Sequence, residues 1–169
     1  MWNENIRDIK MAKKETKTNA MRILETMKIE YEMRTYECED FIDGVHLAEM
    51  LELPYEQVYK TLVTVGKSKN HYVFVIPVAE EIDFKKAARV VGEKSLEMLP
   101  LKDLTAVTGY IRGGCTAIGM KKKFKTVIQE DAEILDNIVV SGGRRGLQLI
   151  LKPEDLQKAA EAEFADVIA

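Results

Sequence analysis

The sequence predicts a single α+β domain with a curved, mixed and largely antiparallel sheet flanked by helices. The chain has 169 residues, of which 46% are hydrophobic, so it is long enough to bury one sizeable core. Segments with helical periodicity alternate with segments in which every second residue is apolar. Short loops between successive strands favour antiparallel pairing. We expect residues 1–16 to form a polar N-terminal arm and residues 17–169 to form the domain.

Four of the five predicted helices begin at a residue suited to starting one, either a capping side chain or a proline in the first turn. The predicted helices follow Thr18 and Asn19, run from Asp43 to near Pro54, from Asp83 to about Val91, over residues 101–107, and from Pro153 to Ala162. The first of these carries its apolar side chains on one side, as expected for a helix that packs on a sheet.

Alternating, β-branched or aromatic segments predict the strands. These segments cover residues 31–37, 58–65, 72–77, 125–128, 138–141 and 147–151. The loop over residues 66–70 is short and polar, so we expect the second and third strands to form a hairpin.

Composition excludes several classes of protein. Two cysteines, Cys38 and Cys115, are too few for a disulfide framework or a zinc-finger set. Such a low cysteine content is typical of proteins in a reducing cytosol. The first residues have no apolar core of a signal peptide, and no apolar segment approaches the length of a membrane span. We therefore expect a cytoplasmic protein that uses no metal, no cofactor and no membrane.

Positive charge is concentrated in one part of a chain whose net charge is −3. Residues 104–128 contain five basic residues and no acid, and residues 137–152 add Arg144, Arg145 and Lys152, again without an acid. This pattern indicates a patch that faces phosphate, although a solvated, lysine-rich loop explains it equally well.

Lys60 lies in an apolar, β-branched strand, on the same face as Val58 and Leu62. Burying an ammonium group is unfavourable by several kcal/mol unless a negative partner compensates. An arbitrary lysine in this position would extend to the surface or meet a carboxylate. The alternative is that Lys60 faces a cleft that receives an anionic ligand or a developing oxyanion.

Two glycine-rich segments, residues 113–119 and 141–146, follow apolar strands or loops. Glycine pairs allow backbone amides to turn toward a phosphate or a carbonyl oxygen that becomes negative. Tight turns alone would explain either segment. The presence of Lys60, Arg144 and Arg145 in the same small domain favours the binding interpretation.

Five ordered segments resemble the YbaK/EbsC branch of the YbaK and prolyl-tRNA synthetase-associated domain family, whose best-known members are Cys-tRNA(Pro) deacylases. The segments cover residues 35–37, 57–62, 108–114, 118–122 and 140–147. The resemblance extends from about Lys17 to the end of the sequence. It implies that residues 17–169 form a YbaK-like aminoacyl-tRNA deacylase domain with the fold of that family.

The resemblance implies trans-editing hydrolysis of mischarged aminoacyl-tRNA, chiefly Cys-tRNA(Pro), in which the thiol of the substrate cysteine attacks its own ester. The implied partners are the 3′ acceptor end of an aminoacyl-tRNA and prolyl-tRNA synthetase. Neither histidine, His46 or His71, falls at a site position of the matched segments. The absence of a recognisable Ser/His/Asp or Cys/His set is consistent with a nucleophile supplied by the substrate.

Site roles follow from the resemblance, position by position. Lys60 matches the essential lysine, which would hold the terminal ribose or phosphate and stabilise negative charge at the ester. The amide of Gly113 is the candidate oxyanion donor. The positions implied for substrate binding are Tyr36, Thr61, Gly114, Ser141, Gly143 and Arg144.

The sequence departs from the better-known members at two places. Gln148 stands where they have an aspartate, and Thr116 and Ala117 stand where many have Ser-Pro. The amino acid removed is therefore open between cysteine, alanine, serine and 2-aminobutyrate.

Two other classes of function also remain: a non-catalytic module that binds tRNA or a synthetase, and a thiol redox protein. The redox class would use Cys38 and Cys115. Nearby positive charge could lower the pKa of Cys115, but free cysteines are more often inert fillers, and the resemblance gives this one no catalytic part.

Overall fold

The structure is a computed structural model that describes residues 17–38 and 40–169. The predicted arm over residues 1–16 lies outside the described residues. The elements are, in chain order, α2 (Asn19–Thr26), β1 (Glu32–Thr35), α3 (Gly44–Met50), β2 (Tyr59–Gly66), β3 (His71–Pro77), α4 (Phe84–Val91), β4 (Leu96–Met98), the 3-10 helix η1 (Leu101–Asp103), α5 (Leu104–Thr108), β5 (Lys125–Gln129), the 3-10 helix η2 (Glu130–Ile134), β6 (Ile138–Ser141), β7 (Leu147–Leu151), α6 (Pro153–Ala160) and β8 (Glu163–Ala165).

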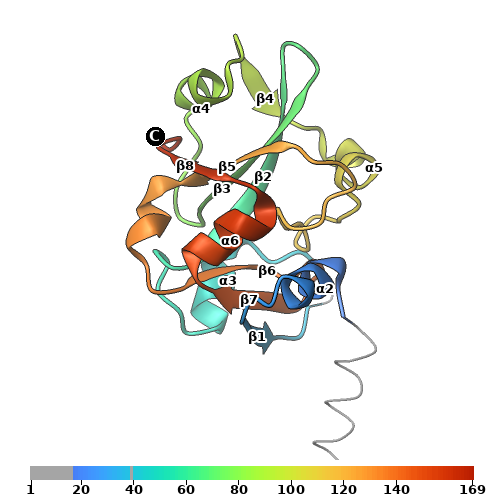
Figure 1. The fold of residues 1–169 in the computed structure, drawn as a ribbon, viewed down its shortest axis with the longest axis vertical. Helices are drawn as coiled ribbons and strands as arrows, with labels where there is room; N and C mark the ends of the chain where they lie inside the picture. Colours follow the sequence, from blue (N-terminus) through green and yellow to red (C-terminus); the bar gives the residue numbers. More distant parts are fainter. Residues whose placement is uncertain (1–16, 39) are drawn as a thin grey trace, which may run out of the picture.

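The strands form two sheets rather than one (Figure 1). One sheet has the order β1-β7-β6 and is antiparallel throughout, and the other has the order β4-β2-β3-β5-β8. In the second sheet β5 runs parallel to both β3 and β8, whereas the other pairs are antiparallel. A bridge between Val58 and Val139 joins the two sheets. The predicted mixed, largely antiparallel α+β domain is thus confirmed, with its strands divided between two sheets.

The predicted hairpin is confirmed between β2 and β3. Lys60 pairs with Ile76, and the amide of Gly66 donates to the carbonyl of Asn70 at 2.8 Å, which closes the turn. Lys69, with φ of 76°, adopts the left-handed conformation that reverses the chain. The register of this hairpin fixes the position of Lys60 along the sheet.

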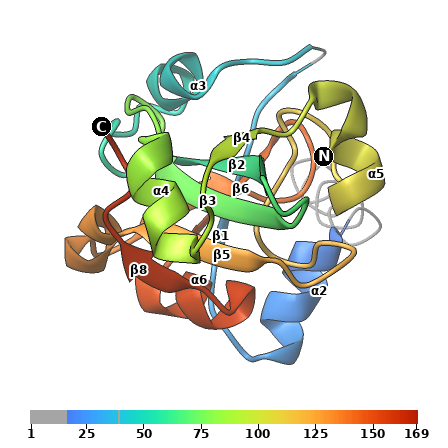
Figure 2. The ribbon, with the colours of Figure 1, turned by 90° about the horizontal axis from the view of Figure 1, so that it is seen from above.

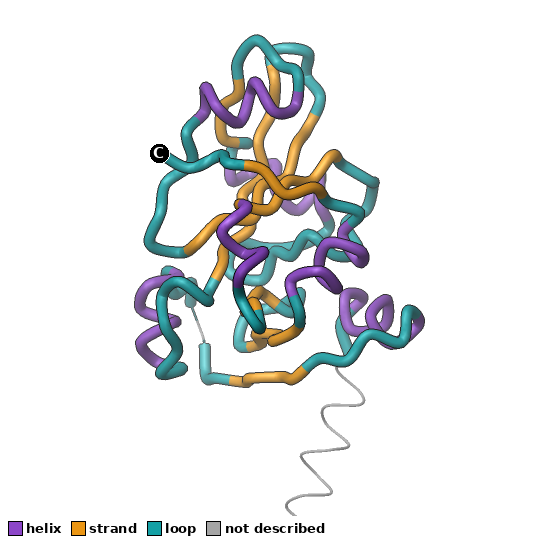
Figure 3. The backbone as a smooth tube through the Cα atoms, turned by 60° about the vertical axis from the view of Figure 1, so that its left-hand side comes forward, coloured by secondary structure: helices purple, strands orange, loops and turns teal. Residues whose placement is uncertain are grey.

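The helices cover different faces of the two sheets. In Figure 2, α3 lies on one side of the strands, and α2 and α6 lie on the opposite side. Side chains of α2 and α6 pack with β5, β6 and β7 in the largest core cluster, while α4 packs on β3 and α3 packs on residues of β6 and β7. Figure 3 shows these helices distributed around the crossing strands.

The predicted starts of α2, α3, α4 and α6 are confirmed, and three of these four helices begin at a capping side chain. The helix predicted over residues 101–107 begins as the 3-10 helix η1, and α5 starts only at Leu104. The side chains of Thr18, Asp43 and Asp83 accept hydrogen bonds from backbone amides of the first turns of α2, α3 and α4. Pro153 occupies the first turn of α6. No helix within the described residues is both long enough and apolar enough to cross a membrane.

Two strands were not predicted from the sequence, β4 and β8, each only three residues long. Helix α6 ends at Ala160, earlier than predicted, because Glu161 turns into the left-handed conformation with φ of 51°. The chain can then pair along β5 as β8.

Residues 163–169 continue from β8 past the start of α4. The amide of Asp83 donates to the carbonyl of Val167 at 2.8 Å, and the amide of Ala169 donates to the carbonyl of Glu81 at 3.0 Å. Ile82 and Ile168 form an antiparallel bridge in the same place. The segment between β3 and α4 is thereby held to the sheet by residues far along the chain.

Phe74 on β3 is fully buried, whereas Phe84 at the start of α4 is 36% exposed. We expect Phe74→Ala to lower the free energy of unfolding by about 3–5 kcal/mol, because it leaves a cavity in the core. Phe84→Ala, the matched control, should lower it by about 1 kcal/mol or less. Urea unfolding followed by circular dichroism measures both, and equal losses would contradict this assignment of the core.

Candidate functional site

A cavity of about 490 Å³ opens beside β2 and is bounded by residues from β6, β7 and the loops on either side of α3 and α5. Its volume lies in the range of pockets that hold small ligands, about 300–1,000 Å³. Its lining is mainly apolar, with a few polar groups that converge on it. Most of these polar groups are residues predicted from the sequence.

Five of the eight predicted site residues line this cavity. Lys60 and Thr61 come from β2, Ser141 from the end of β6, Tyr36 from the residue after β1, and Gly113 from the first glycine segment. The remaining three predicted residues, Gly114, Gly143 and Arg144, are not part of the lining. The fold therefore gathers groups that lie more than a hundred residues apart in the sequence, as Tyr36 and Ser141 do.

Lys60 is half-buried, and its Nζ donates a hydrogen bond to the carbonyl oxygen of Val78 at 3.3 Å. Burial lowers the pKa of Lys60 below the ordinary value for lysine, and the negative charges of Glu81 and Glu80 act in the opposite direction. Within the described part of the chain, the charged residues that line the cavity are Lys60 and Arg112, both cationic. The cavity is therefore suited to a ligand that carries or develops negative charge.

Gln148 on β7 is 3% exposed and lies deep in the cavity lining. Its Nε2 donates a weak hydrogen bond to the hydroxyl oxygen of Tyr36 at 3.5 Å. In the β6–β7 ladder, Gln148 pairs with Ser141. The residue that departs from the better-known pattern thus lies among the predicted substrate-binding side chains. Because its amide is neutral, Gln148 adds no negative charge to the cationic lining of the cavity.

The two glycine segments pack against each other. A Cβ atom added to Gly114 would lie 2.7 Å from the Cα atom of Arg144, which is closer than real side chains allow. Gly143 has φ of 104°, and a Cβ atom there would lie 3.2 Å from Thr18 and 3.3 Å from Tyr110. In this structure Gly114 allows close packing on the backbone of Arg144, and Gly143 leaves room for the side chains of Thr18 and Tyr110. Contact of Gly114 or Gly143 with substrate stays a prediction.

Gly113 differs from these two glycines because it lines the cavity. Its φ is 83°, a conformation that glycine adopts without steric cost. A Cβ atom there would lie 3.2 Å from the ring of Phe41 and 3.3 Å from the side chain of Arg145. Only glycine therefore fits at this point of the wall without displacing its neighbours.

Cys115 also lines the cavity, and burial raises the pKa of its thiol to about 12. The suggestion that nearby positive charge lowers this pKa is not supported, because desolvation dominates. Cys38 does not line the cavity, and its thiol donates to the carbonyl oxygen of Asp40 at 2.7 Å. Both cysteines are free thiols in the structure.

Phe41 and Arg112 line the cavity but were not singled out from the sequence. The guanidinium carbon of Arg112 lies 3.9 Å from the centroid of the Phe41 ring, a cation–π contact. Arg112 is one of the five basic residues in the segment 104–128 and also lies within the segment 108–114 that carries the family resemblance. Nothing in the sequence near Phe41 indicates that its ring would meet an arginine about seventy residues away.

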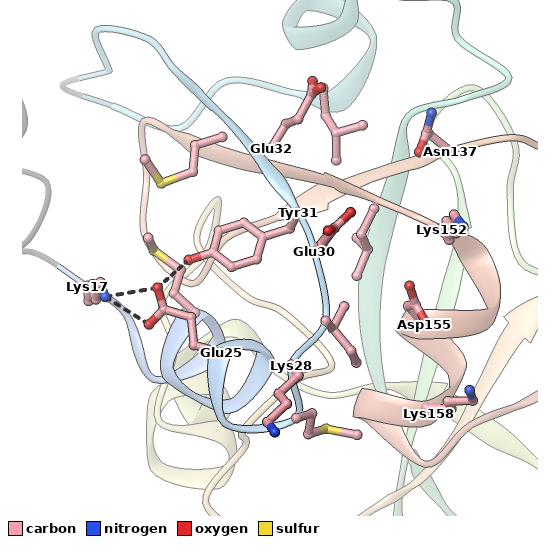
Figure 4. Close-up of a pocket in the computed structure, with 16 residues that line it drawn as sticks. Lys17, Glu25, Lys28, Glu30, Tyr31, Glu32, Asn137, Lys152, Asp155 and Lys158 are labelled. Atoms are coloured by element: carbon pink, nitrogen blue, oxygen red, sulfur yellow. Dashed lines mark hydrogen bonds and ion pairs between the residues drawn. The ribbon is translucent and has the colours of Figure 1, made fainter.

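A wider groove of about 1,210 Å³ lies between α2, β1 and α6 (Figure 4). Its lining contains four lysines and four acidic residues, and Glu25 accepts hydrogen bonds from Lys17 and Tyr31. None of the predicted site residues lines it. Its balanced charge gives no preference for an anionic ligand.

Across residues 17–38 and 40–169, no three His, Cys, Asp or Glu side chains are grouped closely enough to hold a metal ion. The groups that the cavity presents are an ammonium, a guanidinium, hydroxyls, an amide and backbone of a glycine turn. Such groups bind anions and stabilise oxyanions.

Comparison with known proteins places the sequence beside editing domains. Residues 43–159 match the family described as "Aminoacyl-tRNA editing domain". The chain is 47% identical over 162 residues to an Enterococcus faecalis protein named "Putative Cys-tRNA(Pro)/Cys-tRNA(Cys) deacylase EbsC", and the match covers 93% of this chain and 98% of that protein. It is also 27% identical over 121 residues to a proline–tRNA ligase of Lactobacillus delbrueckii, covering 72% of this chain and 21% of the ligase.

Solved structures share the fold. A protein described as a "putative trans-editing enzyme for prolyl tRNA synthetase" superposes with a TM-score of 0.77 at 21% sequence identity. The superposition covers 89% of this chain and 95% of that one. The fold is thus shared with a more distant sequence.

We expect Gly114→Ala to destabilise the protein by about 2 kcal/mol or more, because the added methyl group would force apart the two glycine segments. Gly92→Ala is the matched control, since a Cβ atom at Gly92 meets nothing within 4 Å and only its φ of 78° is strained. That change should lower stability by about 1 kcal/mol. Thermal unfolding measures both, and an unaffected Gly114→Ala protein would contradict the close packing.

The raised pKa of Cys115 predicts slow alkylation. At pH 8 we expect iodoacetamide to react with Cys115 about a hundredfold or more slowly than with a free model thiol, because little thiolate is present. Mass spectrometry of the modified peptide measures the rate, and urea-unfolded protein is the control in which Cys115 should react normally. Reaction of the folded protein at the rate of the model thiol would contradict the raised pKa of Cys115.

Proposed function

The chain belongs to the aminoacyl-tRNA editing domain family, in its YbaK/EbsC branch, and from this membership we propose that it removes cysteine from mischarged tRNA for proline. The reaction would take place in trans, on Cys-tRNA(Pro) that a synthetase has released or still holds. The observation that carries the proposal is the cavity whose charged lining is Lys60 and Arg112, with Gly113 beside them. An ester at the end of an RNA chain brings phosphate charge and develops an oxyanion, and both are stabilised by such groups.

In the proposed reaction, the thiol sulfur of the substrate cysteine attacks the carbonyl carbon of its own ester. The bond between that carbon and the ribose oxygen breaks, and the proton from the thiol ends on the ribose oxygen. The products are a cyclic thiolactone and tRNA with a free 3′ end. Because the substrate supplies the nucleophile, the protein needs only to orient the ester and stabilise charge.

Two groups of the cavity would stabilise the oxyanion. The ammonium of Lys60 is held by strand β2 and by the Val78 carbonyl, so it is already oriented before substrate arrives. The backbone amide of Gly113 is the second donor that we assign to the oxyanion. Removing one donor of this kind typically lowers kcat by about 10²–10³-fold.

Tyr36, Thr61 and Ser141 offer hydroxyl groups to the aminoacyl part of the substrate. The neutral amide of Gln148 lies behind Tyr36, so this part of the cavity suits a small, uncharged side chain. Cysteine fits both this environment and the proposed chemistry. Alanine, serine and 2-aminobutyrate fit the size but lack the thiol.

The predicted partner is prolyl-tRNA synthetase. With a net charge of −3 the chain is expected to bind free tRNA weakly, so delivery by a tRNA-binding enzyme would help. The similarity to part of a proline–tRNA ligase supports this choice, because such a ligase already combines proline charging with a related domain.

The test is a deacylation assay on Cys-tRNA(Pro) and Ser-tRNA(Pro). We expect cysteine to be released and serine to be retained, because serine has no thiol. Lys60→Ala should lower kcat/KM by about a hundredfold or more. The exposed Lys67→Ala protein is the matched control, and Cys115→Ala should keep most of its activity if the substrate supplies the nucleophile.

The outcomes separate the classes of function. A Cys115→Ala protein as inactive as Lys60→Ala would point to a nucleophile on the protein. Binding of Cys-tRNA(Pro) without release of cysteine above the buffer rate would overturn the proposal and indicate a non-catalytic binding module. Release of serine in preference to cysteine would assign a different amino acid to the same site.

A further inference from the structure

The mouth of the cavity is formed by exposed apolar side chains. Phe41, Met98 and Leu101 line the cavity while remaining 39%, 43% and 56% exposed. In contrast Val58 and Gln148, which line its inner part, are buried. An exposed apolar rim around a positively charged cavity indicates that part of the ligand outside the cavity is flat or apolar.

Arg112 stands on this rim in a fixed position. Its guanidinium carbon lies 3.9 Å above the centroid of the Phe41 ring, although the residue as a whole is exposed. The Nε atom of Arg145 donates to the backbone carbonyl of Arg112 at 2.8 Å, which anchors the main chain below the side chain. The guanidinium plane is thus held by a ring beneath it and stays accessible to a ligand.

Arg112 directly precedes Gly113, the glycine that we assign to the ester. In aminoacyl-tRNA the esterified ribose also carries the terminal adenine base. A ligand whose ester lies at Gly113 must therefore place its adenine one ribose ring away from that point. Arg112 and Phe41 offer a planar, cationic and aromatic surface beside Gly113, since a Cβ atom on Gly113 would lie 3.2 Å from the Phe41 ring.

We propose that Arg112, supported by Phe41, binds the 3′-terminal adenosine of the tRNA by stacking of the adenine on the guanidinium, which itself lies over the ring. The proposal rests on the proposed function, since that function decides which RNA end enters the cavity. Bases of single-stranded RNA ends are commonly held on aromatic rings and arginine planes. Stacking explains both the exposed apolar rim and the cation placed on it, whereas a phosphate contact alone would explain only the cation.

The experiment uses an uncharged acceptor-stem RNA hairpin with either a terminal adenosine or a terminal abasic nucleotide, so it needs no deacylation. Fluorescence anisotropy measures Kd for the wild type, Arg112→Ala, Arg112→Lys and Arg22→Ala proteins. Arg22 is an exposed arginine on α2 that does not line the cavity, so its removal controls for the change in net charge.

We expect loss of the terminal base to weaken binding to the wild type by about tenfold, as for a stacked base. Arg112→Ala should bind the adenosine-ended RNA about tenfold more weakly and should no longer distinguish the two ends. Arg112→Lys keeps the charge but not the plane, so it should lose most of the discrimination. Arg22→Ala should discriminate as the wild type does.

Retained discrimination in Arg112→Ala would overturn the proposal. Equal weakening of both RNAs by Arg112→Ala, with discrimination intact, would show that Arg112 contacts phosphate instead. In either case circular dichroism confirms that the variant is folded. If the wild type discriminates between the two RNA ends but releases no cysteine, the proposed function fails and the adenosine subsite stands. If it releases cysteine but does not discriminate between the ends, the proposed function stands and the adenosine subsite fails.

Discussion

The site depends on keeping a cation inside a mainly apolar cavity. Lys60 is placed there by the β2–β3 hairpin, which carries apolar side chains on either side of it and leaves the ammonium bonded to the Val78 carbonyl. A neutral acceptor stabilises the charge less than a carboxylate would, so the ammonium remains available to an anionic ligand. The elements around β2 can be understood as the frame that brings hydroxyls, an amide and a glycine turn to this charge.

Features that depend on neighbouring residues could be predicted from the sequence, and features that depend on packing could not. The caps at Thr18, Asp43 and Asp83 act within one helical turn, so the starts of their helices can be predicted from neighbouring residues. The three-residue strands β4 and β8 form because each pairs with a longer neighbouring strand. The residues within β4 and β8 do not indicate that pairing. The contact of Phe41 with Arg112 likewise arises only when two distant loops meet.

The glycines show the same limit at the scale of single residues. Gly113 and Gly114 are adjacent and cannot be distinguished by composition, and the family resemblance assigned both to the substrate. In the structure Gly113 lines the cavity, while Gly114 lies against the backbone of Arg144 and joins the two glycine segments. The wall of the cavity is therefore a single packed unit in which one glycine faces the ligand and its neighbour secures the wall.

Residues 163–169 hold the segment that follows β3 through backbone hydrogen bonds to Glu81 and Asp83. That segment carries Glu80 and Glu81, the carboxylates that influence Lys60, and it begins just after Val78, whose carbonyl accepts the bond from the ammonium. During synthesis on a ribosome, β2 and β3 emerge about a hundred residues before the stretch that secures this segment. A nascent chain can thus form the hairpin early. The carboxylates of Glu80 and Glu81 take their final positions relative to Lys60 only when residues 163–169 have left the exit tunnel.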